Sequence, residues 1–263
     1  EHMRALSIAV TGMDAQQTRV EVISNNLANM NTTAYAARRA EFTDLHYQIA
    51  RASGATSASD GSIVPEGIQL GLGVRTAAIS MDIMQGTLKA TGGDLDLAIE
   101  GKGYFEITLP SGESAYTRDG SFKRTGEGLI VASEGYRLAG DVTIPEDARS
   151  ITINPEGEVY AYFVGQARGQ LIATTQMAPF ANEKGLEPMG GNLYRETAAS
   201  GPALIGQAGE DGRGTMRQGY LEESSVDVVQ QIAELIEAQR GYELNSKVIS
   251  AADQMLGATV QMR

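Results

Sequence analysis

The chain has no cysteine and no tryptophan, and it has only two histidines among its 263 residues. Without cysteine, disulfide bridges and thiolate metal sites are impossible, and the composition is compatible with any redox compartment. His2 and His46 alone cannot build a histidine-based metal cluster. Aromatic side chains make up 6% of the residues, so aromatic stacking is a poor source of binding energy.

Positive charge and long apolar runs are scarce as well. The chain carries 21 Lys and Arg against 33 Asp and Glu, a formal net charge of −12. Because Lys and Arg drive binding to phosphates, this balance argues against nucleic acid and anionic membrane surfaces. No apolar run approaches the roughly 20 residues of a membrane span, so we expect no membrane insertion. The apolar stretch ALSIAV (5–10) is shorter than a signal-peptide core, so any export is expected to use another route.

No motif predicts an enzyme. Gly101-Lys102-Gly103 lacks the strand–loop–helix spacing of a phosphate-binding loop, and Asp94-Leu95-Asp96 lacks the other ligands of a calcium loop. Ser114 lacks the second glycine of a nucleophile elbow. Carboxylate pairs are plentiful in so acidic a chain, and none stands out as a general acid and base. We therefore expect no catalytic residue, no metal and no cofactor.

Both ends of the chain carry helical periodicity. In the first segment, apolar residues recur at steps of three, four and seven, which predicts an amphipathic helix that stops near Asn29–Asn31. The members of this stripe are Leu6, Val10, Met13, Val20, Ile23, Leu27 and Met30. Four asparagines (Asn25, Asn26, Asn29 and Asn31) crowd its end, although asparagine is a poor residue in a helix interior.

The last segment has a heptad repeat. Val228, Leu235, Tyr242, Ile249 and Leu256 follow one another at steps of seven, which is a coiled-coil signal. Ile232 and Val260 occupy the companion position, but Gln239, Ser246 and Asp253 stand between them. Ser224-Ser225-Val226-Asp227 resembles the capping box that opens such a helix. Because the central companion positions are polar and glycines interrupt the helix, the helix is expected to need neighbours.

Between the two helices the pattern changes to short strands. Residues 50–62 read as a linker rich in Ala, Ser and Gly. Asp119-Gly120 predicts a two-residue hairpin, while 126–128 and 155–157 suit slightly longer turns. The candidate strands are 104–109, 114–118, 121–124, 129–132, 150–153, 158–164 and 170–176.

These patterns predict an α+β fold, in which an antiparallel all-β domain is inserted between long N- and C-terminal α-helices. The terminal helices either pack together within a monomer or form an assembly core with other copies, and periodicity alone does not separate these two possibilities. The predicted parts are an N-terminal helix (3–33), a linker and extended connecting segment (34–94), the β-domain (95–205), a return connection (206–224) and a C-terminal helix (225–263).

Several stretches resemble a known family. ALSIAVTGMDAQQ (5–17) and VISNNLANMNTTAY (22–35) are similar to the N-terminal signature of the bacterial flagellar rod, hook and hook-associated axial proteins. GYELNSKVISAADQML (241–256) resembles their C-terminal signature. The stretches 116–122, 143–159 and 191–203, together with the segment 47–75, resemble the distal-rod branch of the basal-body rod proteins. The departure is at 34–37, which reads Ala-Tyr-Ala-Ala where the family usually has a glycine, an aromatic and a lysine.

The resemblance implies a coiled-coil-like assembly domain, built from the terminal helices of a homo-oligomeric helical filament. The apolar stripes of the two helices would be its interfaces. Such a subunit would leave the cell through the flagellar type III export apparatus. It would form a hollow drive shaft in the basal body, crossing the periplasm to the outer membrane. The implied partners are proximal rod and hook subunits and the peptidoglycan-layer and outer-membrane ring proteins.

Asn25, Asn26 and Asn29 carry the family motif. Asparagine can end a helix in the left-handed conformation and satisfy its carbonyls, and it can also bridge to the backbone of a neighbouring subunit. Both roles stay open from the sequence. Two alternatives to a distal-rod subunit also stay open: a proximal-rod or hook subunit of the same family, and a β module that binds peptidoglycan or a ring protein. A cell-wall hydrolase has no assignable catalytic group.

Overall fold

The computed structural model describes residues 2–44, 48–51, 68–70, 74–82 and 84–261. The chain divides into two compact units. The terminal unit comprises Glu1–Ala28, Arg38–Ser80 and Asp227–Arg263, and the β unit comprises Asn29–Ala37 and Met81–Val226. Two long helices and a large antiparallel β region make the fold α+β, which confirms the predicted class. Most of the predicted linker 50–62 lies outside the described residues.

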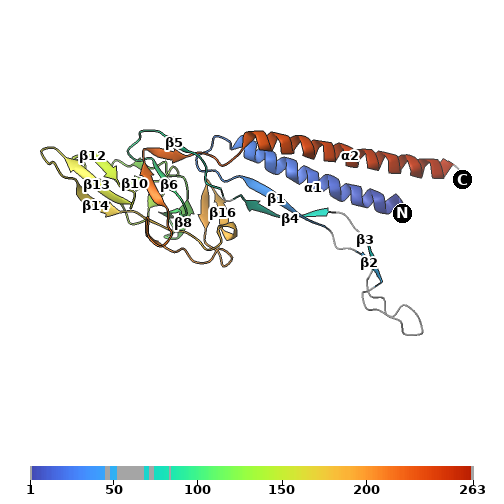
Figure 1. Cartoon of the computed structure of the whole chain (residues 1–263), viewed down its shortest axis with the longest axis horizontal. Helices are drawn as coiled ribbons and strands as arrows, with labels where there is room; N and C mark the ends of the chain where they lie inside the picture. Colours follow the sequence, from blue (N-terminus) through green and yellow to red (C-terminus); the bar gives the residue numbers. More distant parts are fainter. Residues whose placement is uncertain (1, 45–47, 52–67, 71–73, 83, 262–263) are drawn as a thin grey trace, which may run out of the picture. The chain divides into compact units, whose positions relative to one another are not determined.

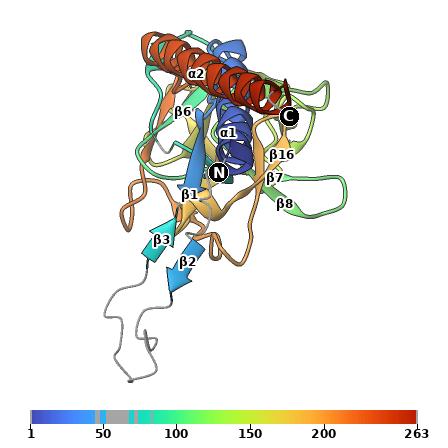
Figure 2. The same cartoon turned by 90° about the vertical axis from the view of Figure 1, so that its right-hand side faces the viewer.

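The terminal unit is built on two helices, α1 (His2–Ala28) and α2 (Val228–Gln261). They lie side by side and run antiparallel (Figures 1 and 2). Two short ribbons belong to the same part of the chain. Their strands are β1 (Arg38–Asp44) with β4 (Val74–Met81), and β2 (Gln48–Arg51) with β3 (Ile68–Leu70).

The start of α2 differs from the predicted capping box. Asp227 caps the helix, because its Oδ1 accepts a hydrogen bond from the backbone N–H of Gln230 at 3.2 Å. Ser225 does not cap the helix, because its Oγ accepts a hydrogen bond from the backbone N–H of Ala37 at 2.9 Å. The cap therefore lies at the last residue of the predicted box. Within the described residues, neither helix has the length of apolar sequence that a bilayer span requires.

The main sheet of the β unit runs in the order β16-β17-β8-β7-β11-β10-β9, with β15 joining β7 to β18. All of its pairings are antiparallel. Its strands are β7 (Phe105–Thr108), β8 (Ser114–Thr117), β9 (Lys123–Arg124), β10 (Ile130–Val131), β11 (Arg137–Leu138), β15 (Gln176–Met177), β16 (Glu187–Gly190), β17 (Leu193–Arg195) and β18 (Gly206–Gln207).

A three-stranded sheet and two ribbons complete this unit. A short 3-10 helix, η1 (Glu183–Gly185), precedes β16. The three-stranded sheet has β12 (Ala148–Ile153), β13 (Glu158–Phe163) and β14 (Gln170–Thr174). The ribbons pair β6 (Leu97–Glu100) with β19 (Thr215–Gln218), and β5 (Leu88–Ala90) with β20 (Tyr220–Glu222).

The core of the β unit follows from strand alternation. In β7, Phe105 and Ile107 are fully buried while Glu106 and Thr108 are half-buried, as expected for one face of a sheet turned inward. Val159 and Ala161 do the same in β13. A smaller cluster collects aromatic rings, with Tyr116 and Phe180 edge-to-face at 4.9 Å. Burial of such side chains contributes roughly 1.5–3 kcal/mol each and holds the strands in register.

Each predicted strand segment overlaps an observed strand, but one predicted turn is wrong. The turns at 126–128 and 155–157 do join paired strands, β9 to β10 and β12 to β13. Asp119-Gly120 is not a hairpin, because β8 pairs with β7 and β17 and not with β9. Gly120 instead lies against the backbone of Leu97, where a Cβ would collide with the carbonyl oxygen. Only a residue without a Cβ lets the backbone at position 120 approach the backbone of Leu97 so closely.

Residues 206–224, predicted as a return connection, form strands. β18 pairs with β15, and the two ribbon strands β19 and β20 pair with β6 and β5. The segment is poor in apolar alternation because each of its strands is only two to four residues long. The chain thus returns towards α2 as part of the β structure.

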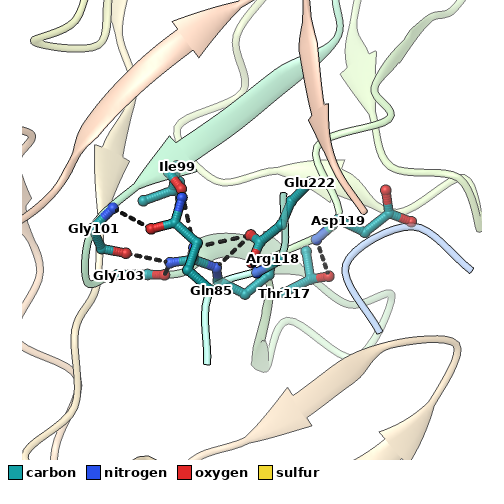
Figure 3. Close-up of polar contacts among 9 residues, drawn as sticks. Gln85, Ile99, Gly101, Gly103, Thr117, Arg118, Asp119 and Glu222 are labelled. Carbon is teal, nitrogen blue, oxygen red and sulfur yellow. Dashed lines mark hydrogen bonds and ion pairs between the residues drawn. The ribbon is translucent and has the colours of Figure 1, made fainter. Parts of the chain in front are cut away.

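A buried ion pair joins Arg118, which follows β8, to Glu222 of β20 (Figure 3). Arg118 Nε and Nη2 both lie 2.9 Å from Glu222 Oε2, and the two side chains are 13% and 6% exposed. The guanidinium also donates to the carbonyl oxygens of Ile99, Gly101 and Gly103 at 2.8–3.0 Å. Glu222 Oε1 accepts from the backbone N–H of Gly86 at 2.9 Å. The charges are therefore fully hydrogen-bonded, which offsets the cost of removing them from water.

Replacing Arg118 should destabilise the β unit strongly. Arg118→Ala leaves the Glu222 carboxylate and three carbonyls without their donor, and we expect the free energy of unfolding to fall by roughly 3–5 kcal/mol in urea titrations. Arg137→Ala is the matched control, because Arg137 pairs with Asp141 in an exposed contact (51% and 66% exposed) that should contribute less than about 1 kcal/mol. Equal losses in the two variants would contradict this account.

Candidate assembly surface of the terminal helices

The two terminal helices meet along a line of small residues. Ala9 and Ala15 of α1 and Ala238 and Ala252 of α2 are all buried. Gly12 packs on Asn245, and a Cβ at position 12 would lie 2.8 Å from Asn245 Nδ2. Small side chains let the backbones approach closely, so the pair closes without large apolar side chains over much of its length.

Two further contacts confirm the antiparallel alignment of the pair. A Cβ at Gly241 would lie 2.9 Å from the side-chain amide of Gln16. Arg19 Nη2 and Glu237 Oε2 are 3.3 Å apart, but the glutamate is 71% exposed, so this ion pair contributes little. Packing, and not charge, therefore holds the helices together.

The buried line on α2 is not the predicted heptad. Gln231 and the two alanines are buried and Asn245 is half-buried, and we call this series the seam: Gln231, Ala238, Asn245 and Ala252. It also repeats at steps of seven, three or four residues away from the heptad of large apolar residues. The spacing of this series is present in the sequence. A search for large apolar residues does not detect it, because its members are small or polar.

The predicted interface residues mostly flank this contact. On α1, Ile23 is buried, while Leu6, Met13, Val20 and Leu27 are half-buried and Val10 is exposed. On α2, Val228, Leu235, Ile249 and Leu256 are half-buried, and Ile232 and Tyr242 are exposed. Met30 lies beyond the end of α1 and is exposed, and the side chain of Val260 lies outside the described residues. Their role in assembly stays a prediction.

The two predicted stripes border one depression. Gln17 and Val20 of α1 and Gln239, Tyr242 and Glu243 of α2 line an open hollow between the helices, which we call the groove. Val20 belongs to the α1 stripe and Tyr242 to the α2 heptad. The helix pair thus presents apolar side chains from both helices on one flank, without burying them.

Asn26 explains why asparagines crowd the end of α1. Its side chain is fully buried, and its Nδ2 donates to the carbonyl of Arg38 at 2.8 Å and to Gln231 Oε1 at 3.1 Å. Its Oδ1 accepts from the N–H of Arg38 at 2.8 Å. The amide therefore pairs with Arg38 as a second strand would, and it also anchors α2. Both amide hydrogens are used within the chain, which favours the local role over bridging to another subunit.

The other two motif asparagines lie differently. Asn25 is exposed on α1, whereas Asn29 follows the helix end and its Oδ1 accepts from Thr32 Oγ1 at 3.0 Å. The backbone N–H of Thr32 also donates to the carbonyl of Asn29 at 3.1 Å. This local turn leads into Ala34, which adopts a left-handed conformation with φ 59. Ala34 stands at the start of 34–37, the stretch that departs from the family pattern.

The first stretch of the β unit, before the chain leaves it at Ala37, is hydrogen-bonded to the last stretch, before α2. The N–H of Ala34 donates to the carbonyl of Glu222 at 2.7 Å, and the N–H of Ser225 donates to the carbonyl of Tyr35 at 2.9 Å. With the Ala37–Ser225 bond, these contacts join 34–37 to 222–225. Residues just after α1 and just before α2 are thereby held side by side within the β unit.

A cavity of about 270 Å³ lies beside this junction, lined in part by Tyr35, Met81, Tyr104 and Glu183. Burial raises the pKa of the Glu183 carboxyl, and burial also raises the pKa of the Tyr104 phenol. These groups form no nucleophile–base arrangement. Across the described residues, no group of three His, Cys, Asp or Glu side chains is placed to hold a metal ion.

Comparison with protein families defines the class. The N-terminal residues 6–35 match the family "Flagella basal body rod protein", and residues 98–161 match the "Flagellar hook protein FlgE/F/G D1 domain". Residues 217–262 match "Flagellar basal body rod FlgEFG protein C-terminal". The matched regions cover most of α1, all of α2 and part of the β unit, and they define a rod or hook protein of the bacterial flagellum.

Curated relatives narrow the class. The chain is 52% identical over 261 residues to the flagellar basal-body rod protein FlgG of Caulobacter vibrioides, covering 99% of this chain and 100% of that protein. It is 48% identical to FlgG of Agrobacterium fabrum over 96% and 97% of the two chains. FlgF of Caulobacter vibrioides is 29% identical over 98% and 96%. The chain belongs to the FlgG family of flagellar basal-body rod proteins and is a structural subunit of the flagellar rod.

Removing the Asn26 amide should weaken the terminal unit. Asn26→Ala removes the partner of the partly buried N–H and carbonyl of Arg38 and of the buried Gln231 amide, and we expect the free energy of unfolding to fall by roughly 1–3 kcal/mol. Helix content followed by circular dichroism in urea measures it. Asn31→Ala, at an exposed position beyond the helix, is the control and should stay within about 0.5 kcal/mol of the parent chain.

Replacing the left-handed Ala34 by glycine should stabilise the chain, in contrast to the Asn26 substitution. Ala34→Gly removes the steric penalty of a Cβ at φ 59, which costs roughly 1–2 kcal/mol in this conformation, so the variant should be more stable. Ala37→Gly is the control, because Ala37 is not among the residues with positive φ and gains nothing. A rise in melting temperature for Ala34→Gly alone would confirm the prediction, and no rise would contradict it.

Proposed function

We propose that this chain is a distal-rod subunit that assembles through its terminal helices into a hollow helical tube. The tube would transmit torque from the motor to the hook, and it would conduct exported subunits through its bore. In this proposal the helices form a coiled-coil-like inner layer, and the inserted β unit faces outward. The role is mechanical and involves no catalysis.

The observation that carries the proposal is the apolar surface left open on the helices. Val229, Leu244 and Met255 of α2 are 79%, 64% and 52% exposed. Burial of one such side chain contributes roughly 1.5–3 kcal/mol, so neighbouring copies that cover them would gain stability. Assembly would then depend on concentration, because covering these side chains needs other subunits.

The setting follows from the family and stays part of the proposal. Proximal rod and hook subunits would join the two ends of the tube, and the peptidoglycan-layer and outer-membrane ring proteins would surround it between the periplasm and the outer membrane. The flagellar type III export apparatus would deliver the subunit. Among the alternatives, identity to FlgG exceeds identity to FlgF of the same organism, 52% against 29%.

Electron microscopy of the concentrated chain should show straight tubes. Val229→Glu places a charge on the exposed helix surface and should raise the concentration needed for tubes at least tenfold, about 1.4 kcal/mol per subunit. The matched control is Val164→Glu in the β unit, where the valine is 80% exposed, and it should assemble as the parent chain does.

Limited proteolysis tests the same proposal on the free subunit. Dilute chain should lose both terminal segments while residues 95–205 survive, and tubes should protect the ends. A dilute monomer with fully protected ends would contradict the proposal. If the chain forms no tubes but binds to sacculi through the β unit, the alternative function, a peptidoglycan-binding module, is favoured.

A further inference from the structure

The cavity beside the junction of 34–37 and 222–225 lies wholly within the β unit. Its volume of about 270 Å³ is slightly below the roughly 300–1,000 Å³ of sites that hold drug-sized ligands. Tyr35, Met81 and Met84 form an apolar part of its wall, and the rest of the wall carries charged and polar groups. The size suits a small ligand or a single side chain.

A buried phenol faces this cavity without a hydrogen bond. Tyr104 is 5% exposed, and its ring packs edge-on against Phe180 and Tyr194, with centroids 5.7 and 6.0 Å apart. Its hydroxyl forms no hydrogen bond with any described residue, yet it keeps accessible surface. Because Tyr104 lines the cavity and is otherwise covered, the hydroxyl is directed into the cavity. Buried polar groups are normally hydrogen-bonded, so this phenol is expected to bond to what fills the cavity.

A carboxylate without a partner lies close to the phenol. Glu183, the first residue of η1, is half-buried and lines the cavity. Within the described part of the chain its side chain forms neither a hydrogen bond nor an ion pair. Burial raises the pKa of the Glu183 carboxyl, and the charge of Glu183 adds to the effect of burial in raising the pKa of the Tyr104 phenol. A cation beside the carboxylate would compensate the charge that burial disfavours.

The other charged groups of the wall decide the sign of the ligand. The Arg118 guanidinium is directed at Glu222 and at three carbonyl oxygens, so its donors are occupied. Among the described residues of the wall, that leaves one base, the exposed Lys102, against two acids, Asp82 and Glu183. An anion would therefore be bound by Lys102 alone, whereas a cation meets both carboxylates.

We propose that this cavity binds a small organic cation, a guanidinium or a primary ammonium group, between the Glu183 carboxylate and the Tyr104 hydroxyl. The cation donates hydrogen bonds to both oxygens, and the bond to the carboxylate is strengthened by its charge. The aromatic rings of Tyr35 and Tyr104 in the wall favour a cation further. The inference goes beyond the proposed assembly and does not depend on it, because all of these residues belong to the β unit.

Methylguanidinium and its neutral analogue methylurea test the inference, because they have similar shapes and differ in charge. Each is titrated into the dilute full-length chain, and the NMR signals of ring-labelled tyrosines report binding. We expect methylguanidinium to bind in the millimolar range and methylurea to bind about tenfold more weakly, because charge-assisted hydrogen bonds are the stronger kind.

Two conservative variants assign the binding groups. Glu183→Gln keeps the size of the side chain and removes its charge, and it should weaken methylguanidinium binding about tenfold. Tyr104→Phe removes a hydroxyl that has no hydrogen bond to lose in the free chain, and it should weaken binding about threefold without lowering the melting temperature. Glu127→Gln is the control, because Glu127 is exposed in the turn between β9 and β10, and it should bind as the parent chain does.

The outcomes also identify the source of the cation. If a basic side chain of a neighbouring copy fills the cavity, tubes should no longer bind methylguanidinium; if a free molecule fills it, tubes should bind the probe as the dilute chain does. Equal binding of both probes, no binding of either, or unchanged binding by Glu183→Gln would overturn the inference, whether or not tubes form. A chain that binds methylguanidinium as expected but forms no tubes would overturn the assembly function and leave this inference standing.

Discussion

Close packing of small side chains between α1 and α2 is the contact on which the terminal unit depends. Buried alanines on both helices, with Gly12 and Gly241, let the helices approach each other closely. Val22 and Ile23 are buried near the end of α1, and most of the other large apolar residues are left on the flanks, half-buried or exposed. A pair sealed by leucines would have satisfied its own hydrophobic surface and offered little to a neighbour. This pair is closed and still leaves apolar side chains exposed, as the proposed assembly requires.

The end of α1 shows how the sequence joins local structure to tertiary structure. Asn26 gives its donors and an acceptor to Arg38 and Gln231, so one buried amide fixes where the helix ends, where β1 begins and where α2 lies. An apolar side chain at this position would remove the hydrogen bonds to the Arg38 backbone. The departure at Ala34 lies a few residues further on, where the backbone takes a conformation that suits glycine.

Much of this fold could be predicted from residue patterns. Helical periodicity at both ends and alternation in 104–176 reflect local preferences, and each predicted strand segment overlaps an observed strand. The seam could not be predicted from hydrophobic periodicity. That pattern selects large apolar residues such as Leu235 and Tyr242, and it passes over a small residue such as Ala238. Nor could the Arg118–Glu222 pair, whose partners lie 104 residues apart and are joined only by the topology of the β unit. The failed Asp119-Gly120 hairpin has the same cause: strand order, and not the dipeptide, decided what followed β8.

The adjacency of 34–37 and 222–225 has a consequence for how such a subunit can vary. The hydrogen bonds between these two segments do not depend on the length of loops elsewhere in the β unit. Loops far from 34–37 and 222–225 can therefore lengthen without moving the two segments apart. Sequence change is tolerated most easily in those loops.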